Sequence, residues 1–200
     1  MSIRVLVGCE CSQVVCSAFR AAGCDAFSCD VQDCYGGHPE WHIKGDVLQV
    51  VDSSWDLFVC HPPCTYLSKC NGFLLRRYPW RFDLGLKAAD FFRRCLSAPV
   101  PFVCVENPIP LHCFGLPPYS QCINPYEFGH PFTKGTCLWL KNLPALFSEH
   151  IIIRSSCRSW VNSVPHKNYH DRQRLRSQTF AGIAAAMVRQ WLPFVGSVSA

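Results

Sequence analysis

A cysteine that directly follows two prolines is the residue best placed for chemistry in this chain. Residues 55–60 form an apolar run that predicts a buried strand, and Pro62 and Pro63 end it because proline cannot continue a ladder. Cys64 then follows the carboxyl end of a strand, the edge at which open α/β sheets bind ligands. We expect Cys64 to be a nucleophile. The alternative is a buried, inert cysteine, since free cysteine packs as a small hydrophobe.

A carboxylic acid ends a second apolar run. Residues 101–105 predict a buried strand that stops at Glu106, Asn107 and Pro108. If the two strands are parallel neighbours, Glu106 lies at the same sheet edge as Cys64. A carboxylate there is costly unless it is used or paired, and we expect partial burial to raise its pKa and keep it able to donate a proton. The alternative role is capping of a following turn.

A thiol and a carboxyl group at neighbouring strand ends suit addition to a pyrimidine ring. The thiolate adds to carbon 6 while the carboxyl group donates a proton to ring nitrogen 3, so that negative charge does not build up on the ring. Carbon 5 then becomes nucleophilic and takes a methyl group from a sulfonium donor. Loss of the carbon 5 proton and expulsion of the thiol complete the cycle. The pair therefore predicts methylation of pyrimidine carbon 5.

The opening of the chain predicts the sheet that would position this pair. A strand over residues 3–7, a turn, a helix over 14–22 and a strand over 25–29 ending at Asp30 form the start of a nucleotide-binding half-sheet. An acid at the end of the second strand commonly holds ribose hydroxyls. Gly8 is the only glycine in the turn, so the dinucleotide fingerprint is absent. The alternative is an ordinary βαβ unit with a surface aspartate.

The remaining pattern predicts an α/β fold in one domain. Residues 65–79 and 111–126 are expected to be irregular. Further elements are expected as strands over 43–47, 136–140 and 151–153 and helices over 81–96 and 180–192.

Composition limits the class of protein. The chain has 200 residues, is 49% hydrophobic and 16% charged, and its apolar runs are too short for a membrane span. No signal peptide is evident, so we expect an intracellular, cytoplasmic protein whose 15 cysteines are mostly free thiols. We expect no metal. Cys60-His61-x-x-Cys64, and Cys157 with His166 and His170, lack a complete second half at zinc spacing.

The net charge of the chain is +5, and many of its basic side chains gather in two groups along the sequence. Interleaved aromatic side chains at Trp80, Trp160 and Tyr169 suit a phosphate backbone with stackable bases, whereas the alternative is a solvated face. The groups are Arg76, Arg77, Arg81, Lys87, Arg93 and Arg94, and Arg154, Arg158, Lys167, Arg172, Arg174 and Arg176 with His166 and His170.

These motifs resemble those of a known family. Pro62-Pro63-Cys64 resembles the catalytic proline-proline-cysteine motif of DNA (cytosine-5)-methyltransferases, and Glu106-Asn107 resembles their glutamate-asparagine motif. The pattern is similar to the short, phage-type members, as further echoed by Phe128-Gly129-His130-Pro131 and by Thr179-Phe180 with Gly182-Ile183-Ala184. The resemblance implies a Rossmann-like class I methyltransferase sheet with flanking helices, S-adenosylmethionine as cofactor, Cys64 as nucleophile and Glu106 as proton donor.

The resemblance also implies binding residues. Around the cofactor it implies Gly8, Glu10, Asp30 and Pro62, with Asp46 approaching the adenine and the last helix closing the site beside the first strand. Against the substrate it implies Pro63 and Asn107, with Lys134 or Thr136 in place of the family's arginine, and the basic side chains Arg172, Arg174 and Arg176.

The predicted partner is DNA, duplex or single-stranded, and a duplex would require base flipping. Residues 141–178 read as a basic, irregular insert within a single methyltransferase domain over residues 1–200, too short for a full target-recognition domain. One alternative is the same chemistry on a free pyrimidine nucleotide or RNA. Another is a non-catalytic binding protein on this scaffold. An amino-group methyltransferase fits poorly, since His61 and Cys64 stand where that class usually has an acid or serine and an aromatic residue.

Overall fold

A seven-stranded mixed sheet forms the centre of the computed structural model, which describes residues 2–164 and 168–198. The strand order is β3-β2-β1-β4-β5-β8-β6; β1 to β5 pair in parallel, and β8 is antiparallel to both of its neighbours. The strands are β1 Arg4–Gly8, β2 Asp25–Asp30, β3 His42–Lys44, β4 Leu57–Cys60, β5 Phe102–Pro108, β6 Gln121–Ile123 and β8 Thr136–Lys141.

Helices connect and cover these strands. The α-helices are α1 Val14–Ala21, α2 Val47–Val50, α3 Phe73–Arg77, α4 Arg81–Leu96, α5 Trp160–Ser163, α6 Tyr169–Ser177 and α7 Ala181–Val198. A small parallel pair is formed by β7 Phe132–Thr133 and β9 Arg158–Ser159. Short 3₁₀ turns cover Pro39–Trp41, Lys69–Asn71, His112–Phe114, Pro125–Phe128 and Arg154–Ser156.

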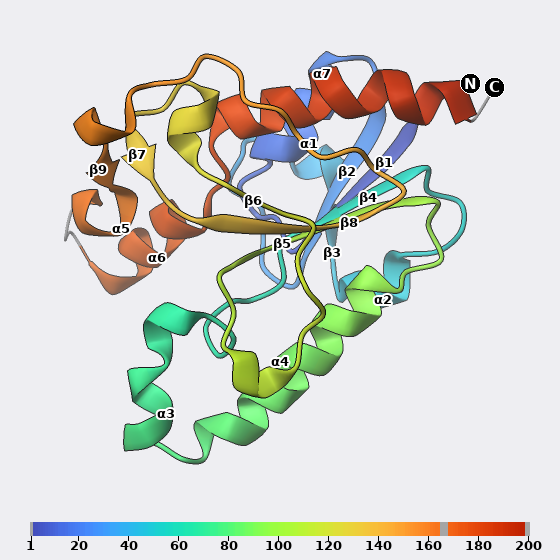
Figure 1. Ribbon diagram of the computed structural model, residues 1–200. Helices are drawn as coiled ribbons and strands as arrows, with labels where there is room; N and C mark the ends of the chain where they lie inside the picture. The colour runs from blue at the N-terminus through green and yellow to red at the C-terminus, as the bar shows by residue number, and fades with distance from the viewer. Residues whose placement is uncertain (1, 165–167, 199–200) are drawn as a thin grey trace.

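The two faces of the sheet bury separate apolar clusters. Alternate residues of β1 point to opposite faces, as the strand period requires. Val5 and Val7 pack in one cluster with Trp191 of α7, and α1 covers the same face. Leu6 packs in the other cluster with Phe92 of α4. Figure 1 shows α7 and α1 running along one side of the sheet and α4 along the other. The predicted α/β Rossmann-like sheet with flanking helices is confirmed.

The last helix is longer than predicted. We expected it to end at residue 192, yet α7 continues through Pro193 to Val198. A proline inside a helix removes one backbone hydrogen bond and costs about 3 kcal/mol. Trp191 and Val195 flank it and are both fully buried against the sheet cluster. Burial of these side chains therefore offsets the local cost, which a propensity rule does not capture.

Two predicted strands are wrong in part or whole. Residues 151–153 form no strand, and Ile151 and Ile153 are 67% and 75% exposed. The strand expected over 43–47 ends at Lys44, because Asp46 caps α2 through a hydrogen bond from the Leu48 backbone N–H. The segments expected to be irregular contain α3 and the edge strand β6, and the insert over residues 141–178, also expected to be irregular, contains α5 and α6.

Candidate active site

The register of β4 and β5 brings the two predicted catalytic motifs to one edge. Cys60 pairs with Val105 in a parallel ladder, so His61, just past the end of β4, and Glu106, still within β5, lie at the same level of the sheet. β4 ends at Cys60, immediately before His61 and the two prolines. The two strands are parallel neighbours, which was the condition for Glu106 and Cys64 to share one sheet edge.

The proline turn is held by the second motif. The side-chain amide of Asn107 donates a hydrogen bond of 2.9 Å to the carbonyl oxygen of Pro62. Asn107 is fully buried, and its side-chain oxygen has no partner among the residues that the structure describes. Asn107 thus fixes the backbone just before Pro63 and Cys64. Pro62 is buried and Pro63 is exposed at the edge.

The Cys64 thiol lies in a turn that begins the segment after β4. The backbone carbonyl oxygen of Cys64 accepts hydrogen bonds from the backbone N–H groups of Leu67 and Ser68, at 3.1 and 3.0 Å. Burial and the negative charge of Glu106 raise the pKa of the thiol, while the charge of Lys134 acts in the opposite direction. The thiol is therefore a weaker acid at rest than a free cysteine.

Glu106 is nearly buried and has a close basic partner. Its Oε2 lies 3.1 Å from Nδ1 of His61, and the exposed fractions of the two side chains are 14% and 9%. Burial acts to raise the pKa of Glu106, but the hydrogen bond from His61 and the positive charge of Lys134 outweigh it and hold the pKa below its usual value. The prediction of a raised pKa was wrong, because the sequence did not show which groups would face this carboxylate.

Lys134 connects the site to the end of α6. Its ammonium group donates hydrogen bonds to the carbonyl oxygens of Arg176 and Gln178, at 3.1 and 3.4 Å. The hydroxyl of Thr136 donates to the carbonyl oxygen of Lys134 at 3.1 Å. Both residues predicted to replace the family's arginine therefore lie beside Glu106, but their polar groups have partners within the chain.

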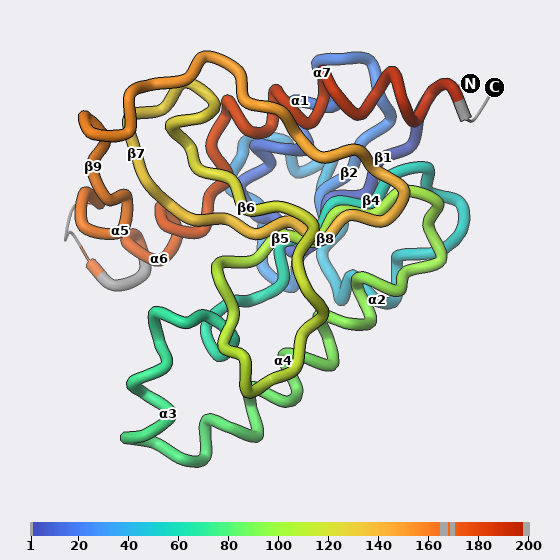
Figure 2. Tube along the Cα trace, viewed as in Figure 1, coloured from blue at the N-terminus to red at the C-terminus, as the bar shows by residue number. Residues whose placement is uncertain are grey.

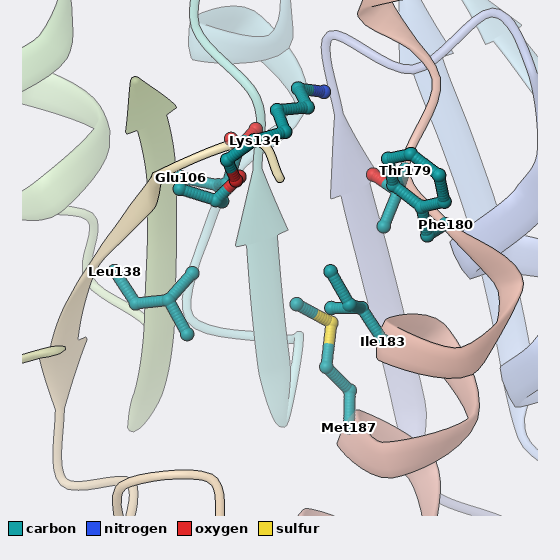
Figure 3. A pocket seen from close by; sticks show the side chains of 8 residues that line it. Glu106, Lys134, Leu138, Thr179, Phe180, Ile183 and Met187 are labelled. Atoms are coloured by element: carbon teal, nitrogen blue, oxygen red, sulfur yellow. The ribbon is translucent and has the colours of Figure 1, made fainter. Parts of the chain in front are cut away.

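A small pocket opens beside Glu106, between the sheet and the start of α7. Figure 3 shows the side chains of Leu138, Ile183 and Met187 facing one another on one side of it, with Glu106 and Lys134 above them. Thr179 and Phe180 line the pocket from the segment that enters α7. The pocket thus joins an apolar side to the carboxyl and ammonium groups.

The first turn of the sheet is built around its own acid. Both oxygens of Glu10 accept backbone N–H groups at the start of α1, from Val15 at 2.7 Å and from Cys16 at 3.1 Å. Glu10 is 4% exposed, and burial raises its pKa although the nearby His61 and these hydrogen bonds act to lower it. The helix N-terminus that would receive a phosphate in a dinucleotide-binding fold is thus filled by a carboxylate of the chain.

Gly8 is required at the end of β1 by packing. A Cβ there would lie 2.7 Å from Val47, 2.9 Å from Phe58 and 3.1 Å from the sulfur of Cys60. This close approach keeps β1 and β4 in contact at their carboxyl ends. The glycine therefore has a structural reason in addition to the predicted closeness to a cofactor.

The two other acids predicted for the cofactor differ in their surroundings. Asp30 ends β2 and accepts the Gln32 backbone N–H at 2.9 Å. Burial, together with the nearby Asp30, raises the pKa of the Cys11 thiol to about 12. Asp46 is exposed and caps α2. Asp30 thus stands at the expected edge, whereas Asp46 has a capping role that the sequence analysis did not assign.

The basic residues of α6 that were predicted to bind the substrate differ in their contacts. The guanidinium group of Arg174 stacks on Tyr35, with Cζ 3.4 Å from the ring centroid. The buried Nε of Arg172 has no partner within residues 2–164 and 168–198. Lys167 and His166 of the same basic group lie outside the described residues. The stacking contact ties α6 to the loop after β2, near Asp30.

His61 is the residue that sequence reasoning missed for this chemistry. The sequence pattern led us to assign it no role in the reaction. Its position immediately before Pro62 was the available signal, because it places the imidazole at the level of Glu106. Within the described part of the chain, no group of three or more histidine, cysteine or acidic side chains is arranged to hold a metal ion.

Two motifs quoted for the family resemblance contact each other. The Gly182 backbone N–H donates to Nε2 of His130 at 3.0 Å, and a Cβ on Gly182 would overlap the carbonyl oxygen of Phe128. Burial lowers the pKa of His130, which suits an imidazole that accepts this hydrogen bond. The turn and the start of α7 therefore form one unit beside the pocket.

Comparison with known proteins gives similarity in backbone shape alone. No family model and no curated protein sequence matches this chain. Solved structures with similar backbones include a protein described as a DNA modification methyltransferase encoded within a prophage of E. coli, with 13% identity, a TM-score of 0.44, and coverage of 76% of this chain and 52% of that one. Another is S. pombe Dnmt2 methyltransferase, with 12% identity, a TM-score of 0.43 and coverage of 84% and 57%. A third is the Entamoeba histolytica methyltransferase EhMeth, with 12% identity, a TM-score of 0.49 and coverage of 86% and 62%.

This chain thus spans between 52% and 62% of the length of those three proteins. No helix in the described ranges is long and apolar enough to cross a membrane.

Proposed function

We propose that this chain is an S-adenosylmethionine-dependent methyltransferase that methylates carbon 5 of cytosine in DNA through a covalent adduct with Cys64. The observation that carries the proposal is the register of β4 and β5, which brings the turn of Cys64 and the carboxylate of Glu106 to one sheet edge. The negative charge of Glu106 acts on the Cys64 thiol, which supports the proposal that the two groups face one site.

The resting charge states suggest how the pair works. The pKa of Glu106 is lowered and that of Cys64 is raised, so the pair holds one proton, on sulfur. The proposed reaction needs a thiolate and a carboxylic acid, which is the same pair with that proton on Glu106. Moving the proton from sulfur to carboxylate changes no net charge. Formation of the sulfur–carbon 6 bond and protonation of ring nitrogen 3 then complete the first step.

The residues at the ends of β1 and β2 fit a cofactor without a pyrophosphate. Glu10 fills the N-terminus of α1, which leaves no free anion site there, and Asp30 ends β2 where ribose hydroxyls would lie. We propose that Gly8, Asp30 and Pro62 adjoin the cofactor, with Glu10 shaping the turn. S-adenosylmethionine bound there supplies an electrophilic methyl group.

A basic and aromatic arm supports nucleic acid as the substrate. We define the arm as residues 69–86, which project from the sheet through α3 and the start of α4 (Figure 2). Phe73 and Trp80 are 67% and 58% exposed on it. Exposed aromatic rings with arginines nearby suit stacked bases and phosphates.

The arm is tied to the turn of the proposed nucleophile. The guanidinium group of Arg81 donates to the carbonyl oxygen of Thr65 at 3.4 Å and lies over the ring of Tyr66 at 4.6 Å. Asn71 donates to the same carbonyl oxygen at 3.1 Å. A strand bound along the arm would therefore lead toward Cys64.

The insert over residues 141–178 remains part of the proposal as a reduced target-recognition region. Helix α6 of this insert makes two contacts near the site. The carbonyl oxygen of Arg176 accepts a hydrogen bond from Lys134, and the guanidinium group of Arg174 stacks on the ring of Tyr35. We propose that Pro63, Asn107, Lys134 and Thr136 adjoin the target base. Arg172, Arg174 and Arg176 would lie toward the phosphates.

Covalent trapping tests this function. The protein is mixed with S-adenosylmethionine carrying a labelled methyl group and DNA containing 5-fluorocytosine, in single-stranded and duplex form. Fluorine blocks loss of the carbon 5 proton, so we expect a labelled covalent adduct that survives denaturation. Cys64→Ser should abolish it, whereas the matched control Cys113→Ser, at an exposed cysteine outside the arm, should retain it.

The absence of an adduct with either DNA, while the cofactor still binds, would refute DNA cytosine as the substrate. The same trap with 5-fluorocytidine in RNA or as a free nucleotide then tests the alternative substrates. Cofactor binding without an adduct on any of them would favour a non-catalytic binding protein.

A further inference from the structure

An imidazole lies between the ends of three strands beside the proposed proton donor. The backbone N–H of His61 donates to the carbonyl oxygen of Gly8 at 3.0 Å, which ties the residue to β1. Its ring nitrogen Nδ1 lies 3.1 Å from Oε2 of Glu106 on β5. The ring is 91% buried, since its side chain is 9% exposed. Its orientation is thus fixed by the strands on both sides of β4.

The hydrogen bonds define which ring nitrogen carries the proton. A carboxylate can only accept, so Nδ1 of His61 is the donor to an ionised Glu106. Nε2 is buried and has no partner among the described residues. A proton on Nε2 would be a buried donor without an acceptor, which is costly. The neutral ring with its proton on Nδ1 fits these surroundings.

The charged groups that face this imidazole come from three elements. Glu10 of the turn after β1 lies near enough to His61 to interact with it electrostatically, and Glu106 of β5 receives its hydrogen bond. Lys134, from the loop before β8, acts on Glu106. Of the groups that favour the ionised form of Glu106, His61 provides the hydrogen bond to the carboxylate and Lys134 acts through its charge.

We propose that His61 is a positioning residue that holds Oε2 of Glu106 and thereby leaves Oε1 as the oxygen that exchanges a proton with ring nitrogen 3 of the target base. This inference rests on the proposed function. When the adduct forms, the Cys64 S–H bond breaks and the sulfur–carbon 6 bond forms. The proton from sulfur reaches Oε1, and the Oε1–H bond then breaks as the nitrogen 3–H bond forms.

The Nδ1–H bond of His61 is kept throughout this sequence. Oε2 remains an acceptor in both the carboxylate and the acid protonated on Oε1, so the same hydrogen bond holds Glu106 in both states. When the thiol is expelled, the proton on nitrogen 3 returns through Oε1 to sulfur. The imidazole thus fixes the direction of the carboxyl group without itself gaining or losing a proton.

Two substitutions separate positioning from a structural role. His61→Asn retains an N–H donor near the place of Nδ1, whereas His61→Leu has similar bulk and no donor. The reactive pair holds one proton, so the rate of adduct formation falls on the acid side when Glu106 also becomes protonated. Loss of the donor raises the pKa of Glu106, so this acid limb should move to higher pH in His61→Leu and stay in place in His61→Asn.

The expected fall in the trapping rate for His61→Leu at its best pH is about 10- to 100-fold, the usual effect of losing one hydrogen bond to a charged group. His61→Asn should recover most of this loss. An equal fall at every pH with an unmoved acid limb would overturn the proposal. Equal behaviour of the two variants, with both folded as judged by thermal unfolding, would also overturn it.

A measurement without turnover keeps this test distinct from that of the proposed function. The side-chain carboxyl ¹³C shift of Glu106 is followed by NMR against pH in the native protein and both variants. His61→Leu should titrate at higher pH than the other two, whether or not an adduct forms. No adduct in the native protein would refute the proposed function, while an unchanged Glu106 titration in His61→Leu would refute the role of His61.

Discussion

The backbone N–H of Gly182 donates a hydrogen bond of 3.0 Å to Nε2 of His130, so helix α7 begins on a turn 52 residues earlier in the chain. The contact leaves no room for a side chain, because a Cβ on Gly182 would overlap the carbonyl oxygen of Phe128. The pocket beside Glu106 is lined in part by the first turns of α7. The stability of this contact therefore bears on the shape of the pocket.

Gly182→Ala is expected to destabilise the protein by about 1–3 kcal/mol, the usual cost of forcing extra volume into a packed site. Unfolding in urea measures the change. Gly45→Ala is the matched control, since a Cβ at Gly45 meets nothing within 4 Å, and it should change stability by much less. Equal stability of Gly182→Ala and the native protein would show that the turn of Phe128 can move away.

Glu106→Gln is expected to lower the rate of covalent trapping by about 10²- to 10⁴-fold, because the amide keeps the shape of the side chain but is not a proton donor of suitable acidity. Binding of S-adenosylmethionine, measured by calorimetry, should be unchanged. Asp90→Asn, at an exposed acid of α4 outside the arm, is the control for loss of one negative charge. A trapping rate that Glu106→Gln leaves intact would contradict its role as proton donor.

Lys134→Met should make the Cys64 thiol less acidic. The positive charge of Lys134 favours the thiolate against burial and the charge of Glu106, so its removal raises the pKa of Cys64 further. Alkylation by iodoacetamide, quantified by mass spectrometry of the Cys64 peptide against pH, should shift to higher pH. Lys87→Met, at an exposed lysine of α4, should leave the profile unmoved. An unchanged profile in Lys134→Met would mean that its charge does not reach the thiol.

Trp80→Ala should weaken binding of single-stranded DNA by about 1–3 kcal/mol, the cost of losing one base stacked on an aromatic ring. Fluorescence anisotropy with a labelled oligonucleotide at fixed salt measures the affinity. Phe147 is 67% exposed on the loop after β8, away from the arm, so Phe147→Ala is the matched control. Equal losses in the two variants would argue against stacking on the arm.

Glu10 should contribute to the pH dependence of the protein's free energy of unfolding. Its folded pKa is raised above the unfolded value, so its contribution to stability is fully present below the unfolded pKa and is lost as pH rises through the folded pKa. Glu10→Gln resembles the protonated form and should flatten this dependence in urea unfolding above about pH 4.3. A pH dependence that is identical in Glu10→Gln would place its origin elsewhere.

Several features of the fold follow from the sequence because they depend on local pattern. The apolar spacing predicted a helix over about residues 81–96, which is α4, and two prolines marked the end of β4. Parallel β4 and β5 were anticipated from two apolar runs that end alike. Cys64 and Glu106 were singled out for the same reason, and their chemical roles remain predictions.

The tertiary structure decided the surroundings of those residues, because burial and charge depend on groups far apart in the chain. The pKa of Glu106 is lowered because His61 and Lys134 face it. His61 stands 45 residues earlier in the chain, and Lys134 comes from the loop before β8. Glu10 is engaged at the start of α1, and Asp46 caps α2. The sequence by itself determined which chemical groups stand at the ends of which strands. Only the folded chain determined what each group contacts, and hence whether it rests protonated or ionised.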